Sequence, residues 1–286
     1  MRKLLILTLG TLLMLSSTFC CVSFTPHLNI SKVFPRKSFL FVEKKTTFFQ
    51  CAKLQCKIVF EGKMTGSASV IFHNKKKTFV LTAAHLVWMQ AIHPIHKMLL
   101  ERKGKLKSVD SWTLTDINDK KYKGIKVIKS NKDNDLAILS ISRNNVPELT
   151  VSSEPPKIGD KLYNVGAPAG TFGKNMVPFY EGRFLGYWKD KRTGSPLPVM
   201  MTSIPVAGGS SGSPILNKYG HVVGMVSAVN RGFHHISISP TWKQLYDFVN
   251  KHLRKHGFNF CTIPDYGEMN IPKNTEPRSW PPVPSR

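Results

Sequence analysis

Short apolar runs rich in β-branched and aromatic residues recur about every ten residues along the middle of the chain, with Gly, Asn and Asp between them. Such spacing is typical of all-β proteins, in which tight turns join short strands. The first two runs are separated by the turn-like residues 62–66, which contain two glycines. The pattern predicts strands over residues 57–61, 67–73, 78–82, 111–116, 124–130, 135–142, 161–166, 181–188, 198–204, 213–216, 221–229 and 235–238.

After residue 240 the apolar positions change to helical spacing. Five large side chains recur on one face of a helix, namely Trp242, Leu245, Phe248, Val249 and Leu253. A Ser–Pro pair at 239–240 predicts the start of this helix and Gly257 predicts its end. We therefore expect a closing helix over 240–256, and a short helical turn at 83–91.

The two ends of the chain have patterns of their own. Arg2 and Lys3 precede an apolar run from Leu4 to Leu15, and small polar residues follow, as in a secretory signal peptide. The sequence predicts a signal peptide over residues 1–23 and an exported protein, secreted or periplasmic. An uncleaved membrane anchor is the alternative, because the apolar run can be extended to Phe24. Residues 262–286 contain six prolines and predict a Pro-rich tail.

Composition narrows the class of protein further. Apolar residues make up 41% of the 286 and charged residues 20%, which allows a packed core and excludes wholesale disorder. The formal net charge is +24, an unusual balance that points to a polyanionic partner: nucleic acid, an anionic lipid surface or an acidic wall polymer. The lysine-rich runs lie at 75–77, 97–107 and 120–132. They are not interleaved with aromatic residues as base-stacking platforms require, and a merely solvated basic face is the alternative.

Three cysteines lie outside the N-terminal segment, at positions 51, 56 and 261. An odd number allows one disulfide and one free thiol. In an exported protein a bridge from Cys261 to Cys51 or Cys56 would tie the two ends of the folded part together, and buried free thiols are the alternative. The spacing of Cys and His residues does not resemble a zinc site, so we expect neither a metal nor a cofactor.

One set of residues is suited to nucleophilic catalysis. His85 follows a predicted strand, Asp135 starts another, and Ser211 lies in the small-residue loop 207–214. A serine hydroxyl needs a base, histidine can supply it, and a carboxylate can orient the histidine. The order His, Asp, Ser is one of the known triad arrangements. Asp133 is a second candidate for the acidic role.

With these segments in view, the chain resembles the trypsin-like (chymotrypsin-fold) serine peptidases, particularly the HtrA/Deg branch and its stand-alone bacterial and phage relatives. Residues 157–170 resemble the "VGD…xxGxPxG" strand and turn of that family, 217–226 its "G-x-V-I-G-I" hairpin, and 236–240 its "FAIP" segment. The resemblance covers roughly residues 60–250. It implies two six-stranded antiparallel β-barrels and a C-terminal helix, with the site between the barrels.

The same resemblance implies catalytic and substrate-binding roles for individual residues. It implies that His85 is the general base, Asp135 its orienting acid and Ser211 the nucleophile, since the family motif puts the acid directly before the apolar strand. The oxyanion donors would be the backbone N–H groups of Gly209 and Ser211. Substrate would lie against Pro205, Val226, Ser227 and Ala228, where an extended peptide pairs with the strand. Neither Pro205 nor Val226 supports cleavage after Arg, Lys or Glu, so we expect a modest apolar specificity pocket.

The prediction from sequence is therefore an exported serine endopeptidase acting on proteins or peptides. Its peptidase domain is expected over residues 50–258, with the first barrel at about 50–145 and the second at about 155–240. The alternative is a catalytically silent protease-fold module that binds polyanions through its basic first barrel.

Overall fold

The computed structural model describes residues 36–52, 55–189, 197–229 and 235–258. The predicted signal peptide at 1–23, the Pro-rich tail at 262–286 and Cys261 lie outside these ranges. Within them, no helix combines the length and the apolar character needed to cross a bilayer. The helices are η1 (Arg36–Ser38), α3 (Ala84–Trp88), α4 (Pro94–Glu101), η2 (Pro168–Gly170), α5 (Trp242–Leu253) and η4 (Arg254–His256).

The first half of the described chain forms one antiparallel sheet, in the strand order β5-β4-β1-β2-β3-β7-β6. Two of its interior strands, β3 and β7, are buried almost throughout, as their continuous apolar runs predict. The strands are β1 (Phe39–Ala52), β2 (Gln55–His73), β3 (Lys77–Ala83), β4 (Lys105–Thr115), β5 (Lys121–Tyr122), β6 (Lys126–Asn131) and β7 (Leu136–Ser142).

The second half forms another antiparallel sheet, in the order β12-β11-β8-β9-β10-β14-β13. Its strands are β8 (Lys161–Val165), β9 (Phe179–Trp188), β10 (Val199–Thr202), β11 (Pro214–Leu216), β12 (Val222–Met225), β13 (Ala228–Val229) and β14 (Ser237–Pro240). The two-sheet, all-β prediction with a C-terminal helix is confirmed, and the arrangement is consistent with a chymotrypsin-like two-barrel fold. Each sheet has seven strands in the described residues rather than six, because a two-residue strand is added at one edge.

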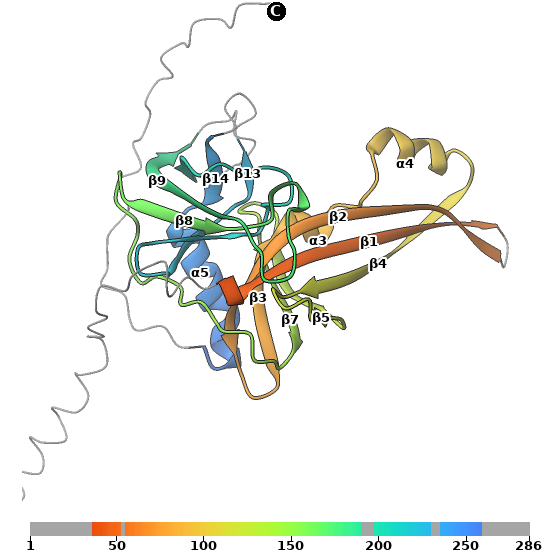
Figure 1. Ribbon diagram of the computed structural model, residues 1–286. Coiled ribbons are helices and arrows are strands. Elements are labelled where there is room, and N and C mark those ends of the chain that lie inside the picture. Colours follow the sequence, from red (N-terminus) through yellow and green to blue (C-terminus); the bar gives the residue numbers. More distant parts are fainter. Residues whose placement is uncertain (1–35, 53–54, 190–196, 230–234, 259–286) are drawn as a thin grey trace, which may run out of the picture.

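A large buried cluster joins the two sheets and includes residues of α5, the blue helix of Figure 1. The helix contacts β7 of the first sheet and β12 of the second. It begins with a capping box between Thr241 and Gln244, and the chain leaves it through Gly257 at a φ of +94°. The predicted closing helix is thus present. The cluster includes Leu81 and Leu139 of the first sheet, Leu216 and Met225 of the second, and Leu245 and Val249 of α5.

The first sheet departs from the sequence prediction at its start. β1 and β2 pair along nearly their whole lengths, and with β4 beside β1 they form a long ribbon that projects from the body (Figure 1). We call its outer part, residues 45–52, 55–63 and 105–111, the arm. The prediction of two strands with a turn at 62–66 is wrong, because β2 runs straight through both glycines. Gly62 serves close approach instead: a Cβ there would lie 1.6 Å from the carbonyl oxygen of Ala91.

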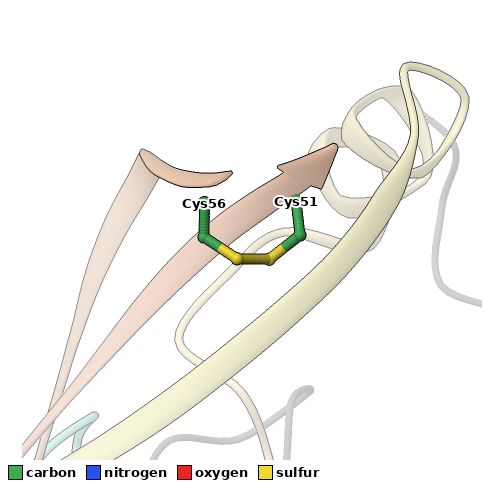
Figure 2. Close-up of a disulfide and its surroundings, with 2 residues drawn as sticks. All are labelled: Cys51 and Cys56. Atoms are coloured by element: carbon green, nitrogen blue, oxygen red, sulfur yellow. A yellow bond between two sulfur atoms is a disulfide. The ribbon is translucent and has the colours of Figure 1, made fainter. Parts of the chain in front are cut away.

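A disulfide closes the end of the β1–β2 hairpin (Figure 2). Cys51 and Cys56 are opposite each other in the strand register, with their Cα atoms 4.1 Å apart. The predicted bridge from Cys261 to one of them is therefore wrong, and so are free thiols at 51 and 56. The error follows from the missed strand β1, which also places the start of the sheet at Phe39 rather than near residue 50.

Lys44 of β1 is a buried lysine, with 1% of its side chain exposed. Its ammonium group donates hydrogen bonds to the carbonyls of Val87 (2.9 Å) and Met89 (2.7 Å). It also lies 2.9 Å from a carboxylate oxygen of Asp110 and 5.1 Å from the centre of the Trp112 ring. A buried ammonium ion needs such partners. Lys44 therefore ties β1 to β4 and to the segment that follows α3.

We predict that Lys44→Met lowers the free energy of unfolding by about 1–3 kcal/mol, because it leaves two carbonyls and a carboxylate without their donor. The neighbouring Lys45 pairs with Glu61 at the surface (2.8 Å), so Lys45→Met should change that free energy by no more than about 0.5 kcal/mol. Urea denaturation followed by circular dichroism measures both. Equal effects of the two substitutions would contradict the structural role of Lys44.

Candidate active site

His85 lies at the start of α3, directly after the buried strand β3. Its Nδ1 atom is 2.8 Å from Oδ2 of Asp135, and its backbone N–H donates to Oδ1 of the same carboxylate (2.7 Å). Both carboxylate oxygens thus face His85, which leaves Nε2 as the ring nitrogen available for a reacting group. This is the relation of acid to base that the sequence predicts.

Asp135 is brought to His85 by strand pairing. β3 and β7 pair with Ala83 opposite Leu136, so the residue before β7 lies beside the residue after β3. Asp135 has a φ of +53°, a conformation that aspartate tolerates better than most residues. The other acidic candidate, Asp133, is exposed, and its N–H donates to the side chain of Asn131 at the end of β6. The structure therefore places Asp135, and not Asp133, on the histidine.

Three serines of the loop after β10 differ in what their hydroxyls contact. The Ser213 Oγ is buried and accepts from Asn164 Nδ2 (2.7 Å), and the buried Ser210 Oγ accepts from the N–H of Ala207 (3.3 Å). Ser211 is partly exposed, and its hydroxyl has no hydrogen-bond partner among the described residues. Of the three hydroxyls, only that of Ser211 is thus free to react.

Ser67, near the inner end of β2, holds this loop against the first sheet. Its N–H donates to the carbonyl of Ser211 (2.8 Å), and its hydroxyl donates to the carbonyl of Gly209 (2.8 Å). The same hydroxyl accepts from the N–H of Ala167 (3.1 Å), and the Ser67 carbonyl accepts from Thr82 Oγ1 (2.8 Å). Sequence analysis did not single out Ser67, since a serine in a strand is ordinary without knowledge of its partners.

Gly212 allows the loop to come this close. A Cβ at Gly212, whose φ is +88°, would lie 2.0 Å from the Ser67 carbonyl oxygen and 2.4 Å from Thr82 Oγ1. Its N–H donates to the carbonyl of Val226 (2.7 Å) on the other side. The loop is therefore clamped between β2 and the segment after β12, next to β3, which ends shortly before His85.

Two backbone donors of the loop are unpaired. The carbonyl of Gly208 accepts from the N–H of Ala169, so the Gly209 N–H, on the same planar peptide, points the opposite way. In the described part of the chain neither this N–H nor that of Ser211 donates a hydrogen bond. These are the two donors that the sequence predicts for an oxyanion, and a tetrahedral intermediate would supply the missing acceptor.

The expected substrate-binding residues lie in different surroundings. Pro205 is partly exposed just before the loop, and Ala228 is exposed in the edge strand β13. Val226 is buried, with its backbone already paired to the loop. The Ser227 hydroxyl donates a short hydrogen bond to Asp135 Oδ2. Ser227 thus contacts the acid directly, a contact that the sequence did not indicate, while substrate binding by these four residues stays a prediction.

One contact of the predicted triad is not formed. Among the described residues, no hydrogen bond joins Ser211 Oγ to His85 Nε2. Hydrogen bonds of this kind are often loose without substrate and tighten in the reacting complex. The His85–Asp135 pair and the Ser211 loop are nonetheless held side by side, because Ser67 and Thr82 join the loop to the end of β3.

Comparisons with known proteins bear on the fold and the family. Residues 66–225 match the family model described as a trypsin-like peptidase domain. The structure of Rv3671c from M. tuberculosis H37Rv, a serine-to-alanine mutant in an inactive form, is similar with a TM-score of 0.52 at 18% identity, covering 83% of this chain and 94% of that one. The HtrA-type protease AlgW with a decapeptide is similar with a TM-score of 0.57 at 15% identity, covering 79% of this chain and 66% of that one. No curated protein matches.

We predict that Ser67→Ala slows any reaction of Ser211 by at least about tenfold, because the Gly209 carbonyl and the Ala167 N–H lose their buried partner. The matched control is Ser69→Ala: Ser69 is as deeply buried on the same strand, but its hydroxyl has no partner among the described residues. Its loss should leave reactivity unchanged. The rate of labelling by a fluorophosphonate measures both variants, and equal rates would contradict the role of Ser67.

We predict that Asp135→Asn lowers this labelling rate by two orders of magnitude or more. Asparagine tolerates the positive φ, so the fold should persist, but an amide in place of the carboxylate favours the wrong tautomer of His85. Asp133→Asn is the control and should leave the rate unchanged. A slow Asp133→Asn variant beside a normal Asp135→Asn variant would reverse the assignment of the acid.

Proposed function

The chain belongs to the trypsin-like peptidase domain family, and on that premise we propose that it is a serine endopeptidase using Ser211, His85 and Asp135. One observation carries the proposal. The unbonded hydroxyl of Ser211 lies in a loop that also presents two unpaired N–H groups, beside a histidine whose other nitrogen faces a carboxylate. A nucleophile, a base and donors for an oxyanion are the parts that acyl transfer needs.

In the proposed reaction, His85 Nε2 removes the hydroxyl proton as Ser211 Oγ attacks the carbonyl carbon of the substrate. The N–H groups of Gly209 and Ser211 donate to the resulting oxyanion, and Asp135 stabilises the imidazolium. The C–N bond breaks as His85 passes its proton to the leaving amine. Water then attacks the acyl ester: His85 takes a proton from it, the acid is released and Ser211 regains its hydrogen.

An extended peptide is the substrate that the surroundings favour. β13 is the edge strand of the second sheet, so its outer backbone groups can pair with an added strand in the way that peptide-binding edges do. Ala228 of β13 and Pro205 before the loop present no charge to such a peptide. We therefore propose a preference for apolar side chains at the cleavage site, and an exported location for the enzyme, as its N-terminal sequence predicts.

We predict that a fluorophosphonate probe labels the protein, and that Ser211→Ala abolishes labelling while Ser213→Ala retains it. The reason is that Ser213 Oγ is buried against Asn164, whereas Ser211 is partly exposed and unbonded. Gel fluorescence after labelling, with circular dichroism of each variant as the folding control, is the measurement. Folded wild-type protein that stays unlabelled across several pH values and salt concentrations would favour the silent, polyanion-binding module instead.

A further inference from the structure

α4 carries an apolar face that nothing in the described chain covers. None of its eight residues is buried. Ile95, Met98 and Leu99 are exposed to 59%, 46% and 47%, and their spacing of three and four residues places them on one side of the helix. Single exposed aliphatic side chains are common on any protein, but three of them on one side of a helix form an exposed apolar patch.

A different side of α4 is fixed to the arm. The ring of His96 packs edge-on against Phe60 of β2, with 4.7 Å between ring centres, and the helix contacts β4. Pro94 occupies its first turn, and the N-cap His93 accepts from the N–H of Ile95 (3.3 Å). The apolar face is therefore held outward, away from the sheet to which the helix is anchored.

Basic side chains are concentrated where α4 leads into β4. Residues 97–107 contain five basic residues and one acidic residue. The acid, Glu101, already pairs with Lys97 within the helix (3.8 Å). The other four are exposed where α4 leads into β4, namely Arg102, Lys103, Lys105 and Lys107. Lys57 of β2 adds another exposed basic residue next to the disulfide.

We propose that α4 and its basic surroundings dock the protein on an anionic lipid surface. Aliphatic side chains on one face of a helix, flanked by Lys and Arg, match an interface in which hydrocarbon lies beneath negative headgroups. Nucleic acids and acidic wall polymers would attract the same charges, but they offer Ile95, Met98 and Leu99 no apolar phase to enter. A second copy of the chain would bring like charges together. Figure 1 places α4 beside the arm and apart from the second sheet, which carries the Ser211 loop.

Hydrogen exchange of the full chain, read peptide by peptide, tests the proposal. It reports on residues 94–101 separately from any lipid affinity of the N-terminal segment. We expect vesicles of phosphatidylcholine with phosphatidylglycerol to slow exchange in α4, and vesicles of phosphatidylcholine alone, or heparin, to leave it unchanged. No slowing with the anionic vesicles would overturn the proposal. Slowing by heparin as strong as by those vesicles would overturn it in favour of docking on a soluble polyanion.

Two pairs of variants separate the apolar and the charged contributions. Ile95→Gln with Leu99→Gln should raise the apparent Kd for anionic vesicles at least tenfold, whereas Ile158→Gln, at a site 77% exposed near the second sheet, should not. Lys105→Gln with Lys107→Gln should raise that Kd by about 25-fold, at roughly fivefold per charge. The distant pair Lys157→Gln with Lys218→Gln is the charge control.

All four variants should be labelled by the fluorophosphonate at the wild-type rate, since none of these residues belongs to the proposed site. Loss of vesicle binding with normal labelling supports docking, whatever substrate the enzyme cleaves. Full binding by Ile95→Gln with Leu99→Gln, next to weak binding by the lysine variant, would show that charge alone attracts the protein and would overturn the role of the apolar face.

Discussion

The geometry of the site depends on the docking of the Ser211 loop onto the inner end of β2, and Ser67 makes that contact. Its backbone and its hydroxyl together bond to two residues of the loop, to Ala167 and to Thr82. Each bond contributes only about 1 kcal/mol net, but a buried group left without its partner costs more than the bond contributes. The two sheets supply different parts of the site, so their relative position decides whether those parts meet.

The same contact explains the small residues around Ser211. Gly212 has the Ser67 carbonyl where a Cβ would lie, and the Gly209 peptide is turned by the bond between the Gly208 carbonyl and Ala169. A loop free in solvent would need neither feature. The run of Gly and Ser in the sequence therefore reflects two requirements at once: close packing on the first sheet, and backbone donors left unpaired on the side away from Ala169.

Sequence reasoning succeeded where a local pattern reflects the final surroundings. The apolar runs of β3, β7, β11 and β12 are buried as their patterns predict. His85 meets Asp135 because β3 and β7, the strands next to them, are paired. It failed where the residues that surround a position are distant from it in the sequence. β1 was missed because Glu43, Lys44 and Lys45 break its apolar pattern, and Lys44 becomes a core residue only through Asp110 and two carbonyls, all more than 40 positions away. Gly62 and Gly66 look like a turn until their neighbours across the fold are known.

One stretch of chain connects His85, the proposed general base, to α4, the proposed docking helix. From His85 the chain passes through α3 to Met89, whose N–H bonds back to the His85 carbonyl, and Lys44 of β1 holds the carbonyls of Val87 and Met89. The chain then passes so close to Gly62 that a Cβ there would lie 1.6 Å from the Ala91 carbonyl oxygen, and it enters α4. Lys44 and the close approach at Gly62 thus hold the segment between His85 and α4 against β1 and β2. The proposed base lies at one end of this segment and the proposed docking face at the other.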